Sequence, residues 1–266
     1  MKDLAGKVAW ITGGGSGIGR ALAVELARRG ARVAVSGRRE ERLEEPVAQV
    51  VAAGGEALAV PCDVLSEEAL TDAVAQVVAT YGGLDVAIAN AGFGLAAPSH
   101  QQTVDDWRRQ LGVNVFGAVG TVQAALPELL KTGGRIALMG SVAAVVTYPS
   151  GAAYAASKAA LGSYGEGLYL DLKGTGVSCT TLHPGFVESE IAQVDNQGNF
   201  REDWKDKRPK AIMWKADRAA RGMVNALVAR KRRKVITGHG ILADALMRLC
   251  PGLVYWLMRT FGVRGS

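Results

Sequence analysis

Short apolar runs alternate with longer amphipathic segments along the chain. The first run, Lys7 to Thr12, ends in glycines. Ile18, Leu22 and Leu26 then recur at helical spacing. The apolar runs predict buried strands at residues 7–12, 32–36, 57–61, 84–90, 135–139, 177–182 and 234–237. The amphipathic segments predict helices at residues 17–29, 40–53, 67–80, 104–130, 152–173 and 215–228.

Strands that alternate with helices pair in parallel through right-handed crossovers. We therefore predict an α/β fold: a single-domain, Rossmann-type, doubly wound parallel sheet of about seven strands with helices on both faces. Because no linker-like boundary interrupts the pattern, residues 1–266 are expected to form one domain. Ligands of such sheets bind outside the carboxyl ends of the strands, where the functional residues are expected.

The composition is that of a globular protein with a sizeable core, since 48% of the 266 residues are hydrophobic and 21% are charged. Cys62, Cys179 and Cys250 lie far apart and show no metal-type spacing, which predicts reduced core thiols and no metal site. The sequence shows no signal peptide and no uninterrupted apolar run of roughly 20 residues, so a cytoplasmic location is expected.

The net charge of +6 fits an anionic cofactor or substrate, or a loose attraction to nucleic acid or acidic lipid. Ordinary solubilising charge explains it equally well. We expect a small-molecule substrate and no nucleic-acid partner.

A glycine-rich turn, TGGGSGIG at residues 12–19, follows the first predicted strand. Gly13, Gly17 and Gly19 allow the backbone to turn sharply and approach a pyrophosphate, and the next helix offers free N–H groups. A purely structural turn is the alternative. The position between the first strand and the first helix favours dinucleotide binding.

The end of the second predicted strand indicates which dinucleotide binds. It reads Ser36-Gly37-Arg38-Arg39, with no carboxylate to hold a ribose 2′-hydroxyl. Arginine binds a 2′-phosphate through paired hydrogen bonds, so NADP(H) is preferred over NAD(H). Alternatively, the two arginines only begin a solvated helix in which nearby glutamates pair with them.

Tyr154 and Lys158 are four residues apart at the start of a predicted helix and share one face. A free tyrosine has a pKa of about 10, and a neighbouring ammonium group favours the phenolate. A packed tyrosine beside a solvated lysine is the alternative. Ser141 precedes Tyr154 by thirteen residues and follows a strand, at the sheet edge where Asn90 is also expected.

Over about residues 5–240, the chain resembles the shorter-chain subgroup of the short-chain dehydrogenase/reductase family. The motifs that carry the resemblance are Thr12 to Gly19, Asp63-Val64, Asn90-Ala91-Gly92, Asn114, Ser141, Tyr154, Lys158 and Pro184-Gly185. The resemblance implies that Tyr154 is the acid/base, that Ser141 steadies the reacting oxygen and that Lys158 lowers the Tyr154 pKa and binds ribose. It also implies that Asn114 holds a water on the proton path.

These motifs, together with the two arginines, predict the remaining contacts. Expected cofactor contacts are Gly13, Gly15, Ser16, Gly17, Ile18, Gly19, Arg38, Arg39, Asp63, Val64, Asn90, Ala91, Gly92, Tyr154, Lys158, Pro184, Gly185, Val187 and Ser189. Expected substrate contacts are Phe93, Ser141, Val142, Ala143, Tyr148 and Phe186. Two positions depart from the family pattern: Ser189 replaces a common threonine that holds the carboxamide, and Ser16 replaces a basic residue of some NADP enzymes.

Residues 188–214 correspond to the family's substrate lid. Phe200, Trp204 and Trp214 are expected either to line an apolar pocket or to pack within the lid. A hydrophobic steroid, retinoid, or long-chain ketone or aldehyde is the expected substrate. Reduction of a 3-oxoacyl thioester is the alternative reaction, and a non-catalytic NADP(H)-binding redox sensor is the alternative class.

The chain continues past the last predicted strand as an apolar helical extension, residues 240–266, interrupted by Pro251-Gly252. This extension is expected to pack over the substrate site or a partner subunit. Alternatively, Leu253, Tyr255, Trp256 and Leu257 lie in a membrane surface beside the basic run 230–234. The family resemblance also implies a homodimer or homotetramer.

Overall fold

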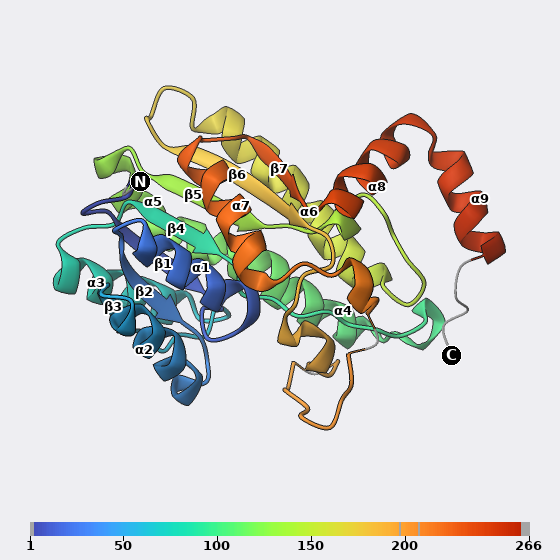
Figure 1. Cartoon of the computed structure of the whole chain (residues 1–266), viewed down its shortest axis with the longest axis horizontal. Helices are drawn as coiled ribbons and strands as arrows, with labels where there is room; N and C mark the ends of the chain where they lie inside the picture. Colours follow the sequence, from blue (N-terminus) through green and yellow to red (C-terminus); the bar gives the residue numbers. More distant parts are fainter. Residues whose placement is uncertain (1–2, 197, 207, 262–266) are drawn as a thin grey trace.

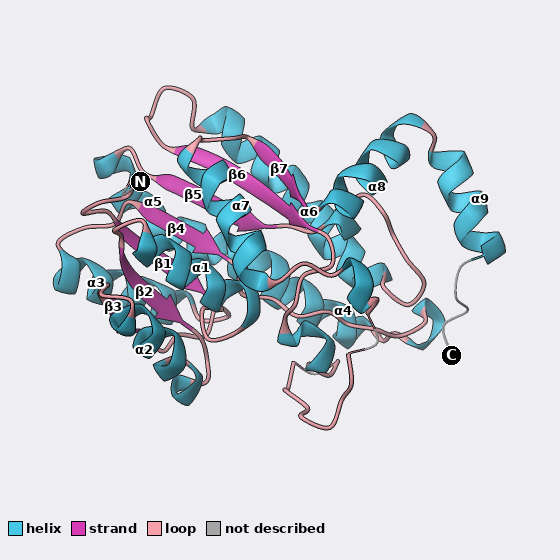
Figure 2. Cartoon of the chain, in the orientation of Figure 1, coloured by secondary structure: helices cyan, strands magenta, loops and turns pink. Residues whose placement is uncertain are grey.

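In the computed structural model, which describes residues 3–196, 198–206 and 208–261, seven parallel strands form one sheet. The strand order is β3-β2-β1-β4-β5-β6-β7, and Figure 2 shows the sheet between helical layers. The strands are β1 (Val8–Thr12), β2 (Arg32–Ser36), β3 (Ala57–Ala59), β4 (Val86–Ala89), β5 (Arg135–Met139), β6 (Ser178–Pro184) and β7 (Arg233–Ile236). The predicted doubly wound α/β sheet is therefore confirmed.

Helices cover both faces of the sheet (Figure 1). The α-helices are α1 (Gly17–Arg28), α2 (Glu44–Ala52), α3 (Glu67–Tyr81), α4 (Val104–Leu111), α5 (Gly117–Thr132), α6 (Ala152–Asp171), α7 (Ala216–Val228), α8 (Gly238–Leu249) and α9 (Pro251–Phe261). Side chains of α1, α2 and α7 pack into the core on one face, and those of α3, α5 and α6 pack into the core on the other. The crossovers therefore bring the carboxyl ends of all the strands to one edge.

Local sequence explains where several helices begin and end. Ser66 accepts a hydrogen bond from the Ala69 amide at the start of α3, and Thr103 and Asp106 form a reciprocal capping box at the start of α4. Gly133 ends α5 in a left-handed conformation, with φ of 59°, which a glycine adopts without strain.

Two predicted helices are interrupted. The segment 40–53 forms a 3-10 turn, Glu40–Arg42, before α2 begins. The segment 104–130 is not one helix, because a π-helical turn, Gly112–Phe116, separates α4 from α5. This turn contains Asn114, whose buried side chain is anchored outside the helix, and π-helical turns commonly occur at functional sites.

The remaining differences are small. Cys62 and Cys179 are buried as expected, but Cys250 is half-buried between α8 and α9 and is not a core thiol. The helical stretch Val104–Thr132 is long enough and apolar enough to cross a membrane. Its helices, however, pack against α3, α6 and β4 within the domain.

The predicted C-terminal extension forms α8 and α9, which meet at an angle of 115°. Helix α8 begins directly after β7, at the functional edge of the sheet. Figure 1 shows α9 projecting from the body of the molecule at the far end of α8.

Candidate active site

The predicted catalytic side chains meet at the carboxyl edge of the sheet. Ser141 follows β5, Tyr154 and Lys158 lie in the first turns of α6, and Asn114 lies in the π-helical turn. The chain adds strands on one side of β1 up to β3, and on the other side from β4 onward, so the strand order reverses between β1 and β4. A doubly wound sheet binds its ligand at such a point. Four residues from three segments thus come together beside that point.

Ser141 is held by hydrogen bonds on both of its oxygens. Its Oγ accepts from the Ala143 amide at 3.1 Å, and its carbonyl oxygen lies 2.9 Å from His183 Nδ1. Ser141 also lies close enough to Tyr154 for its side chain to lower the Tyr154 pKa. The hydroxyl that would stabilise a reacting oxygen is therefore fixed next to the candidate acid/base.

Lys158 is buried beneath Tyr154, one helical turn away. Its Nζ donates a hydrogen bond to the Met139 carbonyl oxygen at 2.7 Å and lies 5.7 Å from the centroid of the Tyr154 ring. Burial lowers the pKa of Lys158 to about 8. The solvated lysine of the alternative interpretation is excluded, because this ammonium group is buried.

Burial raises the pKa of Tyr154 above its ordinary value, while the Ser141 hydrogen bond and the charge of Arg208 lower it in part. Ser141 and a lid residue thus lower this pKa in the structure, and the lowering expected from Lys158 stays a prediction. The charge of Arg208 also lowers the pKa of Tyr148, against the larger rise that the desolvation of this partly exposed side chain causes.

Protein groups hold the Asn114 side chain through three hydrogen bonds. Its Oδ1 accepts from the Phe93 amide, and its Nδ2 donates to the Phe93 carbonyl oxygen and to Ser157 Oγ, each at 3.0 Å. The amide therefore fixes the loop after β4 to α6. That Asn114 holds a water on the proton path stays a prediction.

The glycine turn has the shape of a dinucleotide cradle. A Cβ on Gly13 would lie 2.7 Å from Ala91 Cα, and one on Gly19 would lie 2.1 Å from the Gly13 carbonyl oxygen. In the described part of the chain, the Ser16 side chain makes no capping hydrogen bond at the start of α1. The first amides of α1 thus remain available to a phosphate at the sheet edge.

The two arginines after β2 contact the lid and not the neighbouring glutamates of the alternative interpretation. Arg38 Nη2 donates to the Gly198 carbonyl oxygen at 3.0 Å. Arg39 lies 5.5 Å from the Phe200 ring centroid and 3.8 Å from Glu190. The lid is therefore joined to the end of β2, where a 2′-phosphate would bind.

Arg208 joins the other side of the lid to residues expected to hold the carboxamide. Its Nη1 donates to the Val187 carbonyl oxygen at 3.0 Å and to Ser189 Oγ at 3.3 Å. Its Nη2 donates to the Ser189 carbonyl oxygen, and Asp206 pairs with the same guanidinium. Val187 is buried and bridges to Trp214.

The remaining cofactor contacts follow the strand ends. After β3, the half-buried Asp63 accepts a hydrogen bond from the Leu65 amide at 3.0 Å, and its neighbour Val64 is buried. Asn90 Nδ2 donates to the carbonyl oxygens of Thr12 and Gly13, which holds the glycine turn against β4. Pro184 ends β6 at the same edge.

The predicted substrate residues differ in exposure. Phe93 and Ala143 are buried, Val142 is half-buried, and Tyr148 and Phe186 are exposed. Phe186 stacks on His239 of α8, with 5.4 Å between ring centroids. In the lid, Phe200 packs beneath Arg39 and Arg42, and Trp214 packs beneath Arg218, which matches the lid-packing alternative.

Sequence reasoning missed the residues that position the site. His183 holds the Ser141 carbonyl, and Gln110 bonds the Leu95 amide and the Phe93 carbonyl oxygen. His183 lies on β6, which pairs with β5, so strand order alone indicates its place near Ser141. Among the described residues, no group of three or more His, Cys, Asp or Glu is placed to hold a metal.

Comparison with known proteins agrees with this arrangement. Residues 7–200 match a family model described as short chain dehydrogenase. An "uncharacterized oxidoreductase" of Myxococcus xanthus is 38% identical over 197 residues, which are 74% of this chain and 78% of the relative. A short chain dehydrogenase of Pseudocercospora fijiensis is 34% identical over 260 residues, which are 94% of this chain and 84% of the relative.

Similar folds occur in solved structures of which one holds NAD and another holds NADP. A short chain dehydrogenase/reductase from Burkholderia phymatum in complex with NAD superposes with a TM-score of 0.84, at 29% identity over 96% of each chain. A short chain dehydrogenase from Burkholderia cenocepacia in complex with NADP has a TM-score of 0.77, at 33% identity over 90% of this chain and 99% of the other.

Proposed function

Since the chain belongs to the short-chain dehydrogenase/reductase family of oxidoreductases, we propose that it transfers a hydride between NADP(H) and a carbonyl or secondary alcohol of a hydrophobic substrate. The observation that carries the proposal is the convergence of Ser141, Tyr154 and Lys158 at the ligand-binding edge of the sheet. A redox sensor that only binds the dinucleotide has no use for this convergence.

The chain's own residues handle the proton and the oxygen. A nicotinamide held at this edge of the sheet would supply a hydride to a carbonyl carbon, or accept one from an alcohol carbon. In reduction, Tyr154 donates its phenolic proton to the carbonyl oxygen, and in oxidation its phenolate accepts the alcohol proton. Ser141 donates a hydrogen bond to the same oxygen while negative charge develops on it.

Arg38 and Arg39 support the preference for NADP(H). They follow β2, where an acidic residue would repel a 2′-phosphate, and their guanidinium groups are suited to bind one. The lid contacts Gly198 and Phe200 hold these arginines over that end of the sheet. Dissociation constants for NADPH and NADH test the preference. Arg38→Gln is expected to weaken the binding of NADPH and to leave the binding of NADH unchanged. Equal affinity of the wild type for both dinucleotides would overturn it.

Apolar side chains beside Ser141 support a hydrophobic substrate. Three of them border the catalytic edge: the half-buried Val142 and the exposed Tyr148 and Phe186. A panel of steroid, retinoid and long-chain ketones and aldehydes, with a 3-oxoacyl thioester as the alternative substrate, tests this in an absorbance assay of NADPH. Preference for the thioester favours the alternative reaction, and NADPH binding without turnover of any compound favours a sensor.

We also propose a cytoplasmic homodimer or homotetramer. Members of this family commonly bury their fourth and fifth helices between subunits. These helices correspond here to the stretch of α4 and α5 and to α6, which present exposed apolar side chains, among them Val104, Leu130 and Leu170. Peripheral contact with a membrane is argued separately below from α8 and α9.

A further inference from the structure

One face of α8 is apolar and open to solvent. Its exposed residues recur at positions four apart, which places them on a single stripe. They are Ile241, Leu242, Ala245, Leu246 and Leu249. Leu249, at the end of the helix, is 83% exposed. A soluble monomer rarely leaves such a contiguous apolar stripe uncovered.

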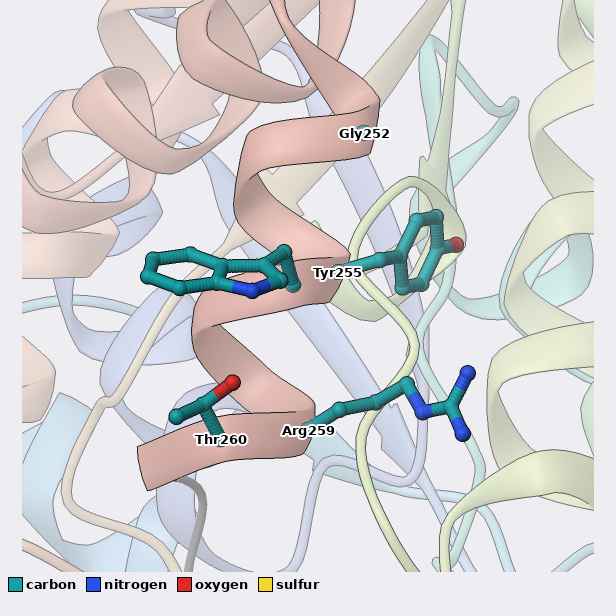
Figure 3. Close-up of a pocket in the computed structure, with 5 residues that line it drawn as sticks. Gly252, Tyr255, Arg259 and Thr260 are labelled. Atoms are coloured by element: carbon teal, nitrogen blue, oxygen red, sulfur yellow. The ribbon is translucent and has the colours of Figure 1, made fainter.

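Helix α9 extends this surface beyond the bend. Leu253, Trp256 and Leu257 are all exposed, and Trp256 is 57% exposed. Figure 3 shows Tyr255 and Arg259 projecting from the same side of α9, with Thr260 on another side. Aromatic residues with one polar atom, next to a cationic group, are typical of the boundary between lipid headgroups and acyl chains.

The exposed charged side chains of the two helices are basic. The sequence of residues 238–261 contains one acidic residue, Asp244, which is buried and paired with Arg233 and Arg248. The side chain of Arg248 remains largely exposed, and Arg259 is exposed on α9. The solvent-facing surface of the segment is thus apolar and basic.

We propose that α8 and α9 together dock on the surface of a lipid bilayer that contains anionic lipids. The apolar stripe of α8 and the exposed side of α9 enter the headgroup region, and Arg248 and Arg259 lie against lipid phosphates. The helices are 12 and 11 residues long, and they meet at 115°. Each is far shorter than the roughly 20 residues that span a bilayer, so the segment lies in the surface.

Charge favours lipid over a second copy of the chain as the partner. In a two-fold contact between the tails, each copy presents the same surface to the other. Such a contact would gather arginines from both copies, and Asp244 is already paired within each. Anionic headgroups supply the missing negative charge without any matching surface on another protein.

The docking surface adjoins the candidate active site. In the first turn of α8, His239 Nε2 accepts a hydrogen bond from the Phe186 amide at 2.8 Å. A Cβ on Gly240 would lie 2.9 Å from Val142 Cγ2. Both Val142 and Phe186 border the predicted substrate site. A docked tail would therefore place the entrance of that site at the bilayer, where apolar substrates dissolve.

Vesicle flotation with the full-length protein tests the docking. We expect binding to vesicles of phosphatidylcholine with phosphatidylglycerol, and weaker binding to phosphatidylcholine alone. Leu249→Glu should lower the partition coefficient at least about tenfold, because it puts a charge where docking would bury an exposed leucine in the headgroup region. Val51→Glu is the matched control: Val51 is an exposed apolar residue (56%) on α2, and its replacement should change nothing.

Arg259→Gln separates the electrostatic contribution. It should reduce binding to the anionic vesicles and leave binding to neutral vesicles unchanged. Reduction of a water-soluble carbonyl compound, and the native mass by light scattering, are measured for every variant. Wild-type protein that does not float with anionic vesicles overturns the proposal. If Leu249→Glu instead lowers the native mass, a second copy covers this surface and the proposal is wrong.

Discussion

At the catalytic edge, the hydroxyl of Tyr154 is the group whose removal tests the proposed chemistry most directly. Tyr154→Phe keeps the ring and removes the only proton that this residue can transfer. We expect turnover to fall about 10²- to 10⁴-fold, while the dissociation constant of NADPH stays unchanged. Tyr169→Phe, at an exposed position on the same helix, is the control and should keep full activity. Retained turnover in Tyr154→Phe would assign the proton transfer to another group.

Arg208 is a positioning residue that acts on Tyr154 through its charge. Because the guanidinium lowers the Tyr154 pKa, its removal should raise that pKa further. Less phenolate is then present at a given pH, so in Arg208→Gln the rising limb of kcat/KM for alcohol oxidation should move to higher pH. Arg208→Lys keeps the charge and should shift less.

Arg201→Gln is the matched control for this experiment. Arg201 also lies on the lid, but it pairs with Asp195 and not with the residues beside Tyr154. Its replacement should leave the pH profile in place. A similar shift in both variants would mean that general loosening of the lid, and not the charge of Arg208, affects Tyr154.

At the scale of elements, Asp244 fastens α8 to β7. Its carboxylate pairs with Arg233 at 2.6 Å and with Arg248 at 3.2 Å. Burial raises the pKa of Asp244, but the two arginines outweigh it and hold the pKa below its ordinary value. The pairing therefore stabilises α8 fully above the pKa of an unfolded aspartate, and its contribution is lost as the pH falls through the lowered pKa.

Asp244→Asn should loosen α8 at neutral pH. We expect the free energy of local opening, measured by amide hydrogen exchange along α8, to fall by about 1.5–3 kcal/mol, the range for hydrogen bonds to charged groups. Glu166→Gln breaks an exposed ion pair with Arg232 and should change little. Unchanged exchange in Asp244→Asn would show that apolar packing alone holds α8.

The strands and most helices were predictable because their periodicity is local. All seven predicted strands form, and the run at residues 135–139 has the predicted bounds. The π-helical turn was not predictable from periodicity, since Asn114 is held by Phe93 and Ser157, which are distant in sequence. The same holds for the lid, where Arg208 meets Val187 and Ser189 through tertiary contacts that no local pattern encodes.

The catalytic residues were accessible to sequence reasoning for a different reason. In parallel α/β sheets the residue after each strand lies at one edge, so Ser141 and Asn90 could be placed together from strand order alone. Their supports leave no motif, because His183 and Gln110 bond to main-chain atoms, and strand order indicates only that His183 lies near Ser141. The effect of Arg208 on Tyr154 also depends on side-chain proximity that only the folded lid creates.

For the whole molecule, the exposed apolar side chains of the π-helical turn and α4 favour self-association. Phe116 is 67% exposed, as is Val104. If these surfaces meet in a dimer, Phe116→Glu would bury an unpaired carboxylate there and should weaken the dimer by at least about tenfold. Light scattering across a dilution series measures this, with Val51→Glu as the control. Because a carboxylate on an open surface costs nothing, an unchanged mass would exclude this surface as the interface.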